Sequence, residues 1–244
     1  MNNSNNTGII YLIPTPLGIN SPLEVLPFYI RKVIEENNYF IVENEKEARR
    51  FIKRIAPTKN QETLQLFPLN KFTSQIEIEE YLEPCKKGIS MGLFSDAGCP
   101  GIADPGAAII RLAHQKQITV KPMVGPSSII LAMMGSGMNG QNFAFNGYLP
   151  IDKTERRKTI KKYETKALKN KQSQIFIETP YRNNQLFDDF IKTLHPETKL
   201  CIGCDITFET EYIKTLNVSE WKKTKLALDK RPAIYIIDCD PLTV

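Results

Sequence analysis

Aspartate, glycine and proline residues gather in the stretch Gly92 to Gly106, which reads GLFSDAGCPGIADPG. The short apolar segment 89–91 precedes it as a predicted strand, and a helical pattern begins at Ala107. Glycine allows positive φ and close backbone approach, whereas proline fixes φ, so such a loop holds a defined shape. Ligands bind at the carboxyl ends of strands in an open α/β sheet. We therefore interpret the stretch as a ligand-binding loop, in which Asp96 accepts hydrogen bonds from hydroxyl or amine groups. A long surface connection is the alternative.

Three further loops follow predicted strands. PTPLG (Pro14–Gly18) is a rigid turn or a simple strand stop, and ETPYR (Glu178–Arg182) comes from the second half of the chain. GPSS (Gly125–Ser128) opens a helix, where free backbone N–H groups beside two hydroxyls favour a carboxylate or a ribose. Ordinary N-capping is the alternative for these serines. Together the loops predict a cleft between two lobes that holds a polar, adenosine-like cofactor.

The residues that other chemistries need are missing or wrongly spaced. The two histidines, His114 and His195, have neither metal-ligand nor triad spacing. No GxxxxGK[ST] phosphate loop is present, and no GxGxxG follows the first strand. Cys201 and Cys204 form one CxxC inside an apolar run, which is weak evidence for zinc, so we predict no metal. Five scattered cysteines, no apolar leader and no membrane-spanning run favour a cytoplasmic protein without a membrane partner.

The order of elements predicts an α/β protein of two lobes. Hydrophobic residues make up 41% of the 244 residues, which excludes global disorder. Strands alternate with helices in residues 1–128, which predicts an N-terminal lobe with a parallel sheet. Residues 129–244 have more strands per helix, which is typical of an α+β lobe with a mixed sheet. The predicted strands are 8–13, 39–42, 63–69, 89–91, 118–124, 174–178, 199–206, 212–217 and 233–238, and the predicted helices are 27–37, 45–55, 74–85, 107–116, 125–134, 152–171 and 184–194.

Basic residues concentrate in the stretch 152–171, within a chain whose formal net charge is +5. The pattern predicts a long helix whose thin apolar stripe consists of Ile160, Tyr163 and Leu168. A solvated helix face is one interpretation of these charges, and a nucleic-acid surface is the other.

Several of these motifs resemble those of a known family. SDAGCPGIADPG, from Ser95 to Gly106, matches nearly letter for letter the SDAGTPxISDPG signature of the tetrapyrrole-methylase-like (class III) methyltransferases. The chain is most similar to the branch that 2′-O-methylates a cytidine of small-subunit ribosomal RNA. It matches that branch in order at YLIPTPLG (YVVPTPIGN), VGPSS (PGPxA), FNGYLP (xGFLP) and IFIETPYR (FYESPHR), over nearly its whole length. The resemblance implies two α/β lobes, S-adenosylmethionine in the cleft and a homodimer.

By position, the resemblance implies cofactor contacts from both lobes. Cys99 stands where the family usually has threonine, a small replacement that leaves a backbone contact intact. Arg182 occupies the family's SPHR position, beside the implied cofactor. If the substrate is RNA, we expect Arg182, Arg156 and Arg157 to contact it; no catalytic base is assigned. The implied cofactor contacts are Leu17, Phe94, Ser95, Asp96, Cys99, Ser127, Ser128 and Glu178.

Two stretches depart from the RNA-methylating branch. Its EDTRHT reads ENEKEA here (Glu43–Ala48), and its RELTKxHE reads CDITFETE (Cys204–Glu211), which loses the arginine. We therefore predict an S-adenosylmethionine-dependent methyltransferase with ribosomal RNA as the favoured substrate. Two alternatives stay open: a methyltransferase for a small molecule such as a tetrapyrrole, and a cofactor-binding, RNA-interacting protein without catalysis. Apolar residues near the lobe junction give mild support to the homodimer, namely Phe143, Phe145 and Tyr148.

Overall fold

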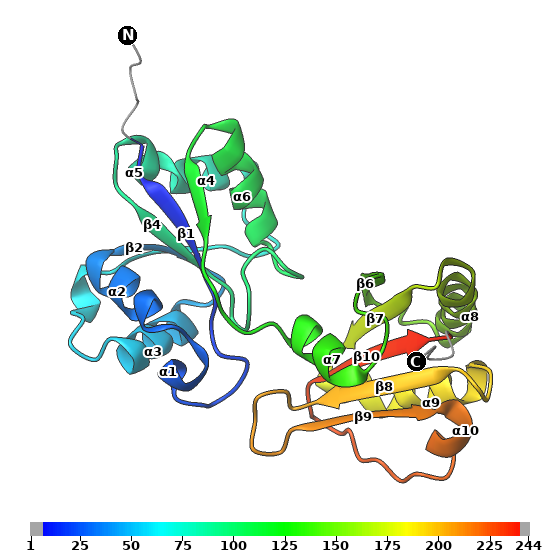
Figure 1. The fold of residues 1–244 in the computed structure, drawn as a ribbon. Helices are drawn as coiled ribbons and strands as arrows, with labels where there is room; N and C mark the ends of the chain where they lie inside the picture. Colours follow the sequence, from blue (N-terminus) through cyan, green and yellow to red (C-terminus); the bar gives the residue numbers. More distant parts are fainter. Residues whose placement is uncertain (1–6, 240–244) are drawn as a thin grey trace. The chain divides into compact units, whose positions relative to one another are not determined.

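The structure, a computed structural model, describes residues 7–239. The chain divides into two compact units, Met1–Ser127 and Ser128–Val244. Each unit is built on a sheet of five strands (Figure 1). We call them the first unit and the second unit.

The first unit is an open parallel sheet with the strand order β3-β2-β4-β1-β5. All its strand pairs are parallel, so the carboxyl ends of β1, β2 and β4 lie at one edge of the sheet. Strands buried on both faces read as apolar runs, as the all-buried β4 does. The strands are β1 (Ile9–Ile13), β2 (Tyr39–Val42), β3 (Gln65–Pro68), β4 (Met91–Phe94) and β5 (Thr119–Pro122).

Helices cover both faces of this sheet. Alternate strand residues point to opposite sides, so Ile13 and Phe94 pack in one core while Leu12 and Leu93 pack in the other. The first core is closed by α1 (Pro22–Val25), α2 (Phe28–Glu36) and α3 (Glu45–Ile55). The second is closed by α4 (Gln75–Tyr81), α5 (Glu83–Lys86) and α6 (Gly106–Gln115). A short 3₁₀ helix, Gln61–Thr63, precedes β3.

Helix α3 begins at a side-chain cap and presents one apolar face to the core. The Asn44 carboxamide oxygen accepts hydrogen bonds from the backbone N–H groups of Lys46 (3.0 Å) and Glu47 (3.3 Å). Acidic residues lie in its first turn and basic residues in its last, which complements the helix dipole. Its buried stripe is Ala48, Phe51, Ile52 and Ile55. The remaining, charged face is left on the surface of the unit.

The second unit is a mixed sheet with the order β6-β7-β10-β8-β9. Only β6 and β7 pair in parallel; the other three pairs are antiparallel. The strands are β6 (Phe143–Tyr148), β7 (Ser173–Glu178), β8 (Lys199–Cys204), β9 (Tyr212–Asn217) and β10 (Ala233–Asp238). The helices are α7 (Ser128–Ser136), α8 (Lys153–Asn170), α9 (Asn183–Thr193), α10 (Val218–Trp221) and a 3₁₀ turn, Pro180–Arg182.

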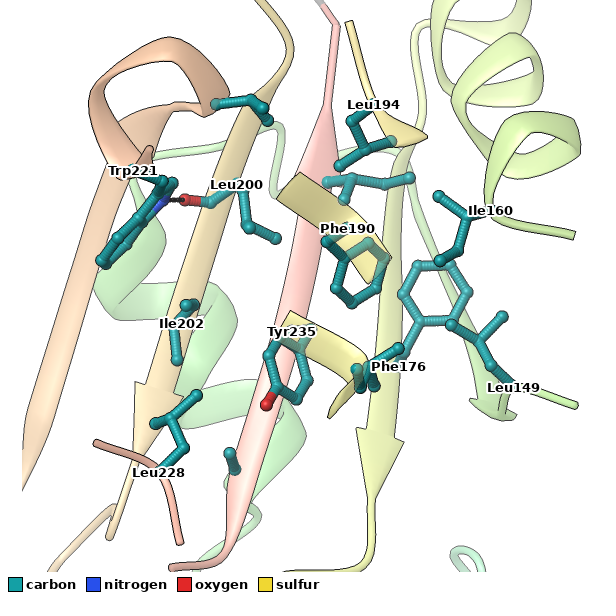
Figure 2. Packing of buried hydrophobic residues seen from close by; sticks show 14 of the residues in the cluster. Leu149, Ile160, Phe176, Phe190, Leu194, Leu200, Ile202, Trp221, Leu228 and Tyr235 are labelled. Carbon is teal, nitrogen blue, oxygen red and sulfur yellow. Dashed lines mark hydrogen bonds between the residues drawn. The ribbon is translucent and has the colours of Figure 1, made fainter. Parts of the chain in front are cut away.

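The core of the second unit is built from aliphatic side chains with four buried aromatic rings among them, between the sheet and α8, α9 and α10 (Figure 2). The Phe190 ring lies 5.9 Å from that of Phe176 and 5.4 Å from that of Tyr235, between centroids. Trp221 donates a hydrogen bond from Nε1 to the backbone oxygen of Leu200 (2.8 Å), so its one polar atom is satisfied. Helix α7 contacts β8, β9 and β10 on the other face, where the closely packed Gly135 leaves room for Ile213.

The predicted fold class is confirmed: a parallel α/β sheet precedes a mixed sheet with helices. Several details differ from the sequence prediction. Strand β4 spans Met91–Phe94 and not 89–91, so the loop begins at Ser95 and not at Gly92. The predicted helix 74–85 is two helices. In α8, Ala167 is fully buried while Leu168 is 64% exposed, so Leu168 does not belong to the apolar stripe.

Strand β6 and the short helices α1 and α10 were not predicted at all. Within the part of the chain that the structure describes, no helix combines the length and the apolar character needed to cross a bilayer.

Candidate functional site

Three loops at the carboxyl edge of the first sheet are joined by short hydrogen bonds. Thr15, after β1, and Gly98, after β4, exchange two backbone bonds: Thr15 N–H to the Gly98 oxygen (3.0 Å) and Gly98 N–H to the Thr15 oxygen (3.1 Å). Cys99 lies against the loop after β5, with its Sγ 3.4 Å from the Pro126 oxygen. Strand β1 lies between β4 and β5 in the sheet, which brings these loops together.

Side chains of the loop residues reinforce this bridge. The Ser95 hydroxyl donates to the Gly98 oxygen (2.9 Å), and the Thr15 hydroxyl donates to the Ser95 oxygen (3.1 Å). Gly98 has φ = +80°, and a Cβ there would stand 3.2 Å from the Leu17 side chain. The backbone conformation therefore favours glycine, and a Cβ would press on the flexible end of the Leu17 side chain. Ser95 and Thr15 are buried and act as structural supports of the loop.

Asp104 shapes the second half of the long loop. Its carboxylate accepts hydrogen bonds from the backbone N–H groups of Gly101 (2.9 Å) and Gly106 (2.7 Å), at the start of α6. Burial raises the pKa of the Asp104 carboxyl, and these two bonds oppose the rise. The second aspartate of the signature thus holds the loop and the helix start together.

A cavity of about 460 Å³ opens at the carboxyl ends of β1, β2 and β4, beside α3. Its volume lies in the range of small-molecule sites. It lies within the first unit and is lined by Thr15, Pro16, Gly18, Ile19, Val42, Glu43, Asn44, Glu47, Ala48, Arg50, Phe51, Lys53, Arg54, Phe94, Ser95 and Asp96. Three of the implied cofactor residues, Phe94, Ser95 and Asp96, thus share one cavity.

Two carboxylates lie close together in this cavity. The Asp96 backbone N–H donates to Glu43 Oε1 (2.9 Å), which links the end of β4 to the end of β2. Burial raises the pKa of the Glu43 carboxyl, the Asp96 amide opposes the rise, and the charges of Asp96 and Asp104 add to it. Burial also raises the pKa of Asp96, with a contribution from Glu47. The Asp96 side chain itself is exposed, as an acceptor for a ligand has to be.

The remaining implied cofactor residues are spread over the two units. Cys99 and Leu17 belong to the tied loops of the first unit, where burial raises the pKa of the Cys99 thiol and keeps it neutral. Ser127 ends the first unit, and Ser128 begins the second as the first residue of α7. Glu178 ends β7 in the second unit.

Glu178 is paired with the residue predicted to contact the substrate. Its buried carboxylate accepts from Arg182 Nε (3.0 Å) and from the Thr179 backbone N–H (2.6 Å). Arg182 also donates to the Thr179 hydroxyl (3.3 Å), and 26% of its side chain stays exposed. These hydrogen bonds to Glu178 and Thr179 fix the orientation of the Arg182 side chain within the second unit.

Metal chemistry finds no support in residues 7–239, where no three His, Cys, Asp or Glu side chains are grouped as ligands. Cys201 and Cys204 are buried in β8, and burial raises the pKa of each thiol to about 11. Both are therefore neutral thiols of the core at physiological pH.

Comparison with known proteins identifies the family. No family model matches the chain. The ribosomal RNA small subunit methyltransferase I of Buchnera aphidicola subsp. Schizaphis graminum is 30% identical over 240 residues, which cover 97% of this chain and 80% of that protein. The chain belongs to the ribosomal RNA small subunit methyltransferase I family. The protein of the same name from Escherichia coli O157:H7 is 25% identical over 237 residues, 96% of this chain and 79% of that protein.

Solved structures share the fold of this family member. The crystal structure of diphthine synthase matches with a TM-score of 0.65 over 94% of this chain and 89% of that chain, at 11% identity. The methyltransferase CobJ matches with a TM-score of 0.62 over 95% of this chain and 94% of that chain, at 13% identity. At such identities the likeness shows the fold alone. Family membership makes the chain an S-adenosylmethionine-dependent methyltransferase, and the resemblance drawn from the sequence is confirmed.

Helix α8 uses its first two arginines inside the second unit. Arg156 is 2% exposed and donates from Nε to Asp189 of α9 (2.9 Å) and from Nη1 to the Ile151 oxygen (2.6 Å). Arg157 donates from Nε to the other oxygen of the same carboxylate (2.7 Å). Burial raises the pKa of Asp189, but the hydrogen bonds from both arginines hold it below its ordinary value. Arg156 is therefore a packing residue that joins α8 to α9, and a phosphate does not reach it on this surface.

Thr15, Glu43 and Asp104 complete the site although the sequence analysis assigned them no role. Glu43 directly follows β2, and the rule that ligands gather at the carboxyl ends of strands applies to it. Thr15 bonds to the distant backbone of Ser95, and Asp104 bonds to the backbone of Gly106, two residues on. The residue type alone does not reveal such contacts.

The Arg156–Asp189 pair generates a stability prediction. Arg156→Ala removes the buried partner of Asp189 and leaves this buried carboxylate only the half-exposed Arg157, so the change is expected to cost up to about 3–5 kcal/mol of the free energy of unfolding. Arg157→Ala removes a half-exposed partner and is expected to cost less than about 1 kcal/mol. Urea unfolding read by the fluorescence of Trp221, the single tryptophan and a core residue of the second unit, measures both.

The pH dependence of the free energy of unfolding provides the control for the Arg156–Asp189 pair. Because the native pKa of Asp189 is depressed, the stabilisation by Arg156 is lost only as the pH falls below the ordinary aspartate value of 3.8. The difference in the free energy of unfolding between wild type and Arg156→Ala should therefore become smaller as the pH falls below this value. Equal, small costs for the two variants at neutral pH would contradict the assignment.

Proposed function

We propose that the protein transfers the methyl group of S-adenosylmethionine to a ribose 2′-hydroxyl of small-subunit ribosomal RNA. The observation that carries the proposal is the 30% identity, over 97% of the chain, to a protein named ribosomal RNA small subunit methyltransferase I. Ribosomal RNA is a cytoplasmic substrate, so we place the protein in the cytoplasm. Five free cysteines are consistent with that compartment.

The first unit fits the cofactor by the chemistry of its donors and acceptors. Asp96 offers an exposed carboxylate to hydroxyl or amine groups at the rim of a cavity of sufficient volume. Gly98 keeps the bridged loops free of a Cβ, which allows close approach to the backbone. S-adenosylmethionine supplies an electrophilic methyl group when bound. Leu17, Phe94, Ser95, Asp96, Cys99, Ser127, Ser128 and Glu178 are proposed to hold it.

The task that residues of the chain then have is to hold the acceptor hydroxyl in line with the methyl group. Methyl transfer needs alignment of donor and acceptor more than acid–base chemistry, so positioning supplies most of the rate. Arg182, fixed by Glu178 and partly exposed, is proposed to orient the RNA substrate. Arg157 is half-exposed and stays a candidate for a phosphate contact. Arg156 is buried and is not such a candidate.

We also propose that the protein acts as a homodimer. Strand β6 is an edge strand of the second sheet, where unpaired backbone groups are available to a second chain. It carries Phe143 and Phe145, which are half-buried, and Tyr148, which is 56% exposed. A stable two-fold interface buries upwards of about 1,000 Å². Light scattering at micromolar concentration is expected to give twice the chain mass of 27.8 kDa, and a monomeric mass would contradict the dimer.

Ribosomal RNA from a strain without this gene tests the main proposal. Nuclease digestion and mass spectrometry should show one ribose of the small-subunit RNA without its methyl group. Purified protein and S-adenosylmethionine should restore the group on small ribosomal subunits from that strain. Identical mass maps with and without the gene would overturn the proposal.

Replacing Asp96 by alanine tests the cofactor site. Loss of a charged acceptor is worth about 1.5–3 kcal/mol, so S-adenosylmethionine should bind roughly ten- to hundred-fold more weakly in calorimetry. Asp188→Ala removes the same charge from the surface of α9, where 62% of the side chain is exposed, and should leave the affinity unchanged. No binding heat for wild type with either S-adenosylmethionine or its demethylated product would rule out the site.

A further inference from the structure

We infer that the exposed basic face of α3 binds the phosphates of the RNA substrate and brings the acceptor nucleotide to the cavity that α3 shares with Asp96. The inference rests on the proposed function and assigns the RNA-binding element within it. It moves the main phosphate contacts from α8, the most basic stretch of the sequence, to a helix in the first unit.

The charges of α3 are largely uncompensated. Its polar face carries five cations and two carboxylates, and among residues 7–239 only Arg50 of these cations forms an ion pair, with Glu47 (2.9 Å). Four cations of this helix have no ion-pair partner among residues 7–239, namely Lys46, Arg49, Lys53 and Arg54. A polyanion gains most from cations that are not already neutralised, because each phosphate contact releases condensed counterions.

Hydrogen bonds to neutral carbonyls hold three of these cations in place. Arg49 donates to the Gln61 oxygen (2.8 Å), Lys53 to the Pro57 oxygen (2.9 Å) and Arg54 to the Ile19 oxygen (2.8 Å). A carbonyl orients the side chain but leaves its net charge intact. The basic face of α3 is therefore both pre-positioned and electrostatically active.

Helix α8 pairs half of its eight cations. Its arginines share Asp189, Lys158 pairs with Glu155 (2.8 Å) and Lys161 pairs with Glu164 (2.8 Å). The other four have no ion-pair partner among residues 7–239, as on α3, but no cavity shared with Asp96 lies beside them. The formal charge of this stretch overstates the field that it presents to an RNA strand.

The hollows beside α3 give the basic face a shape suited to a nucleotide chain. The cavity of about 460 Å³ has Arg50, Lys53 and Arg54 on its α3 side. An open groove of about 540 Å³ on the same helix is lined by Glu45, Lys46, Arg49, Arg50, Lys53 and Gln61. Lys46 and Lys53 are seven residues apart, roughly 10 Å along a helix, so the basic face is long enough to contact more than one phosphate.

The carboxylates of the cavity add a direction to this surface. Glu43 and Asp96 lie where β2 and β4 end and line the same cavity as three of the α3 cations. They repel phosphate but accept hydrogen bonds from hydroxyl groups. The phosphates of an RNA strand therefore fit the α3 cations, with a ribose hydroxyl turned into the cavity, next to the cofactor that Asp96 is proposed to hold.

A pair of charge-matched double variants tests the inference. Lys46→Gln with Arg49→Gln removes two cations from α3 that line the groove but not the cavity, and Lys162→Gln with Lys169→Gln removes two exposed cations from α8. Binding to small-subunit ribosomal RNA is measured by filter retention from low to high salt. The α3 variant is expected to flatten the slope of log affinity against log salt by about 1 to 2, with the larger loss of affinity at low salt. The α8 variant is expected to keep the wild-type slope.

Calorimetry with S-adenosylmethionine accompanies the salt series, and both variants should bind the cofactor like wild type. An unchanged slope in the α3 variant, a loss confined to the α8 variant, or equal losses in both would each overturn the inference while the proposed function stands. Absence of methylation of small ribosomal subunits by the wild-type protein would instead refute the proposed function, and the inference with it.

Discussion

Two backbone hydrogen bonds between Thr15 and Gly98 fix the geometry on which the site of the first unit depends. They join the loops after β1 and β4, and Cys99 extends the contact to the loop after β5. This pairing of the loops goes with φ = +80° at Gly98 and leaves little space between Gly98 and the Leu17 side chain. Because the loops constrain one another, Asp96 is presented from a rigid turn. A preorganised acceptor avoids the entropy cost of ordering a loop on binding.

Much of the fold follows from local sequence patterns. The bounds of β2, α3, β9 and β10 agree with the prediction because apolar runs and caps define them without long-range help. Gly92 was misread as the start of the loop. It is buried in β4, where a Cβ would stand 2.6 Å from the Phe40 ring, so this glycine serves packing against a neighbouring strand. Residue type alone does not separate that role from a turn.

The site was predictable where one loop carries its own chemistry, as the signature from Ser95 to Gly106 does. The contacts between residues of different elements were not predictable. Glu43 meets the Asp96 amide across 53 residues, and Arg156 meets Asp189 across 33. Periodicity shows which face of a helix is polar, but it does not show which carboxylate the tertiary structure brings to it. The sequence therefore predicts that Arg156 contacts the substrate, whereas in the structure it is buried and joins two helices.

The two basic helices differ in the surroundings of their unpaired cations. On α8, half of the cations pair with carboxylates of α9 and of its own turns, and these pairs stabilise the second unit. On α3 the partners are mostly carbonyl oxygens, which set the direction of each side chain and leave its field in the solvent. Such a field extends about 8 Å at physiological ionic strength, across the cavity beside the helix. Cations that attract phosphate and carboxylates that accept hydrogen bonds from hydroxyl groups thus line one cavity, and both kinds of group suit a ribose-methylating site.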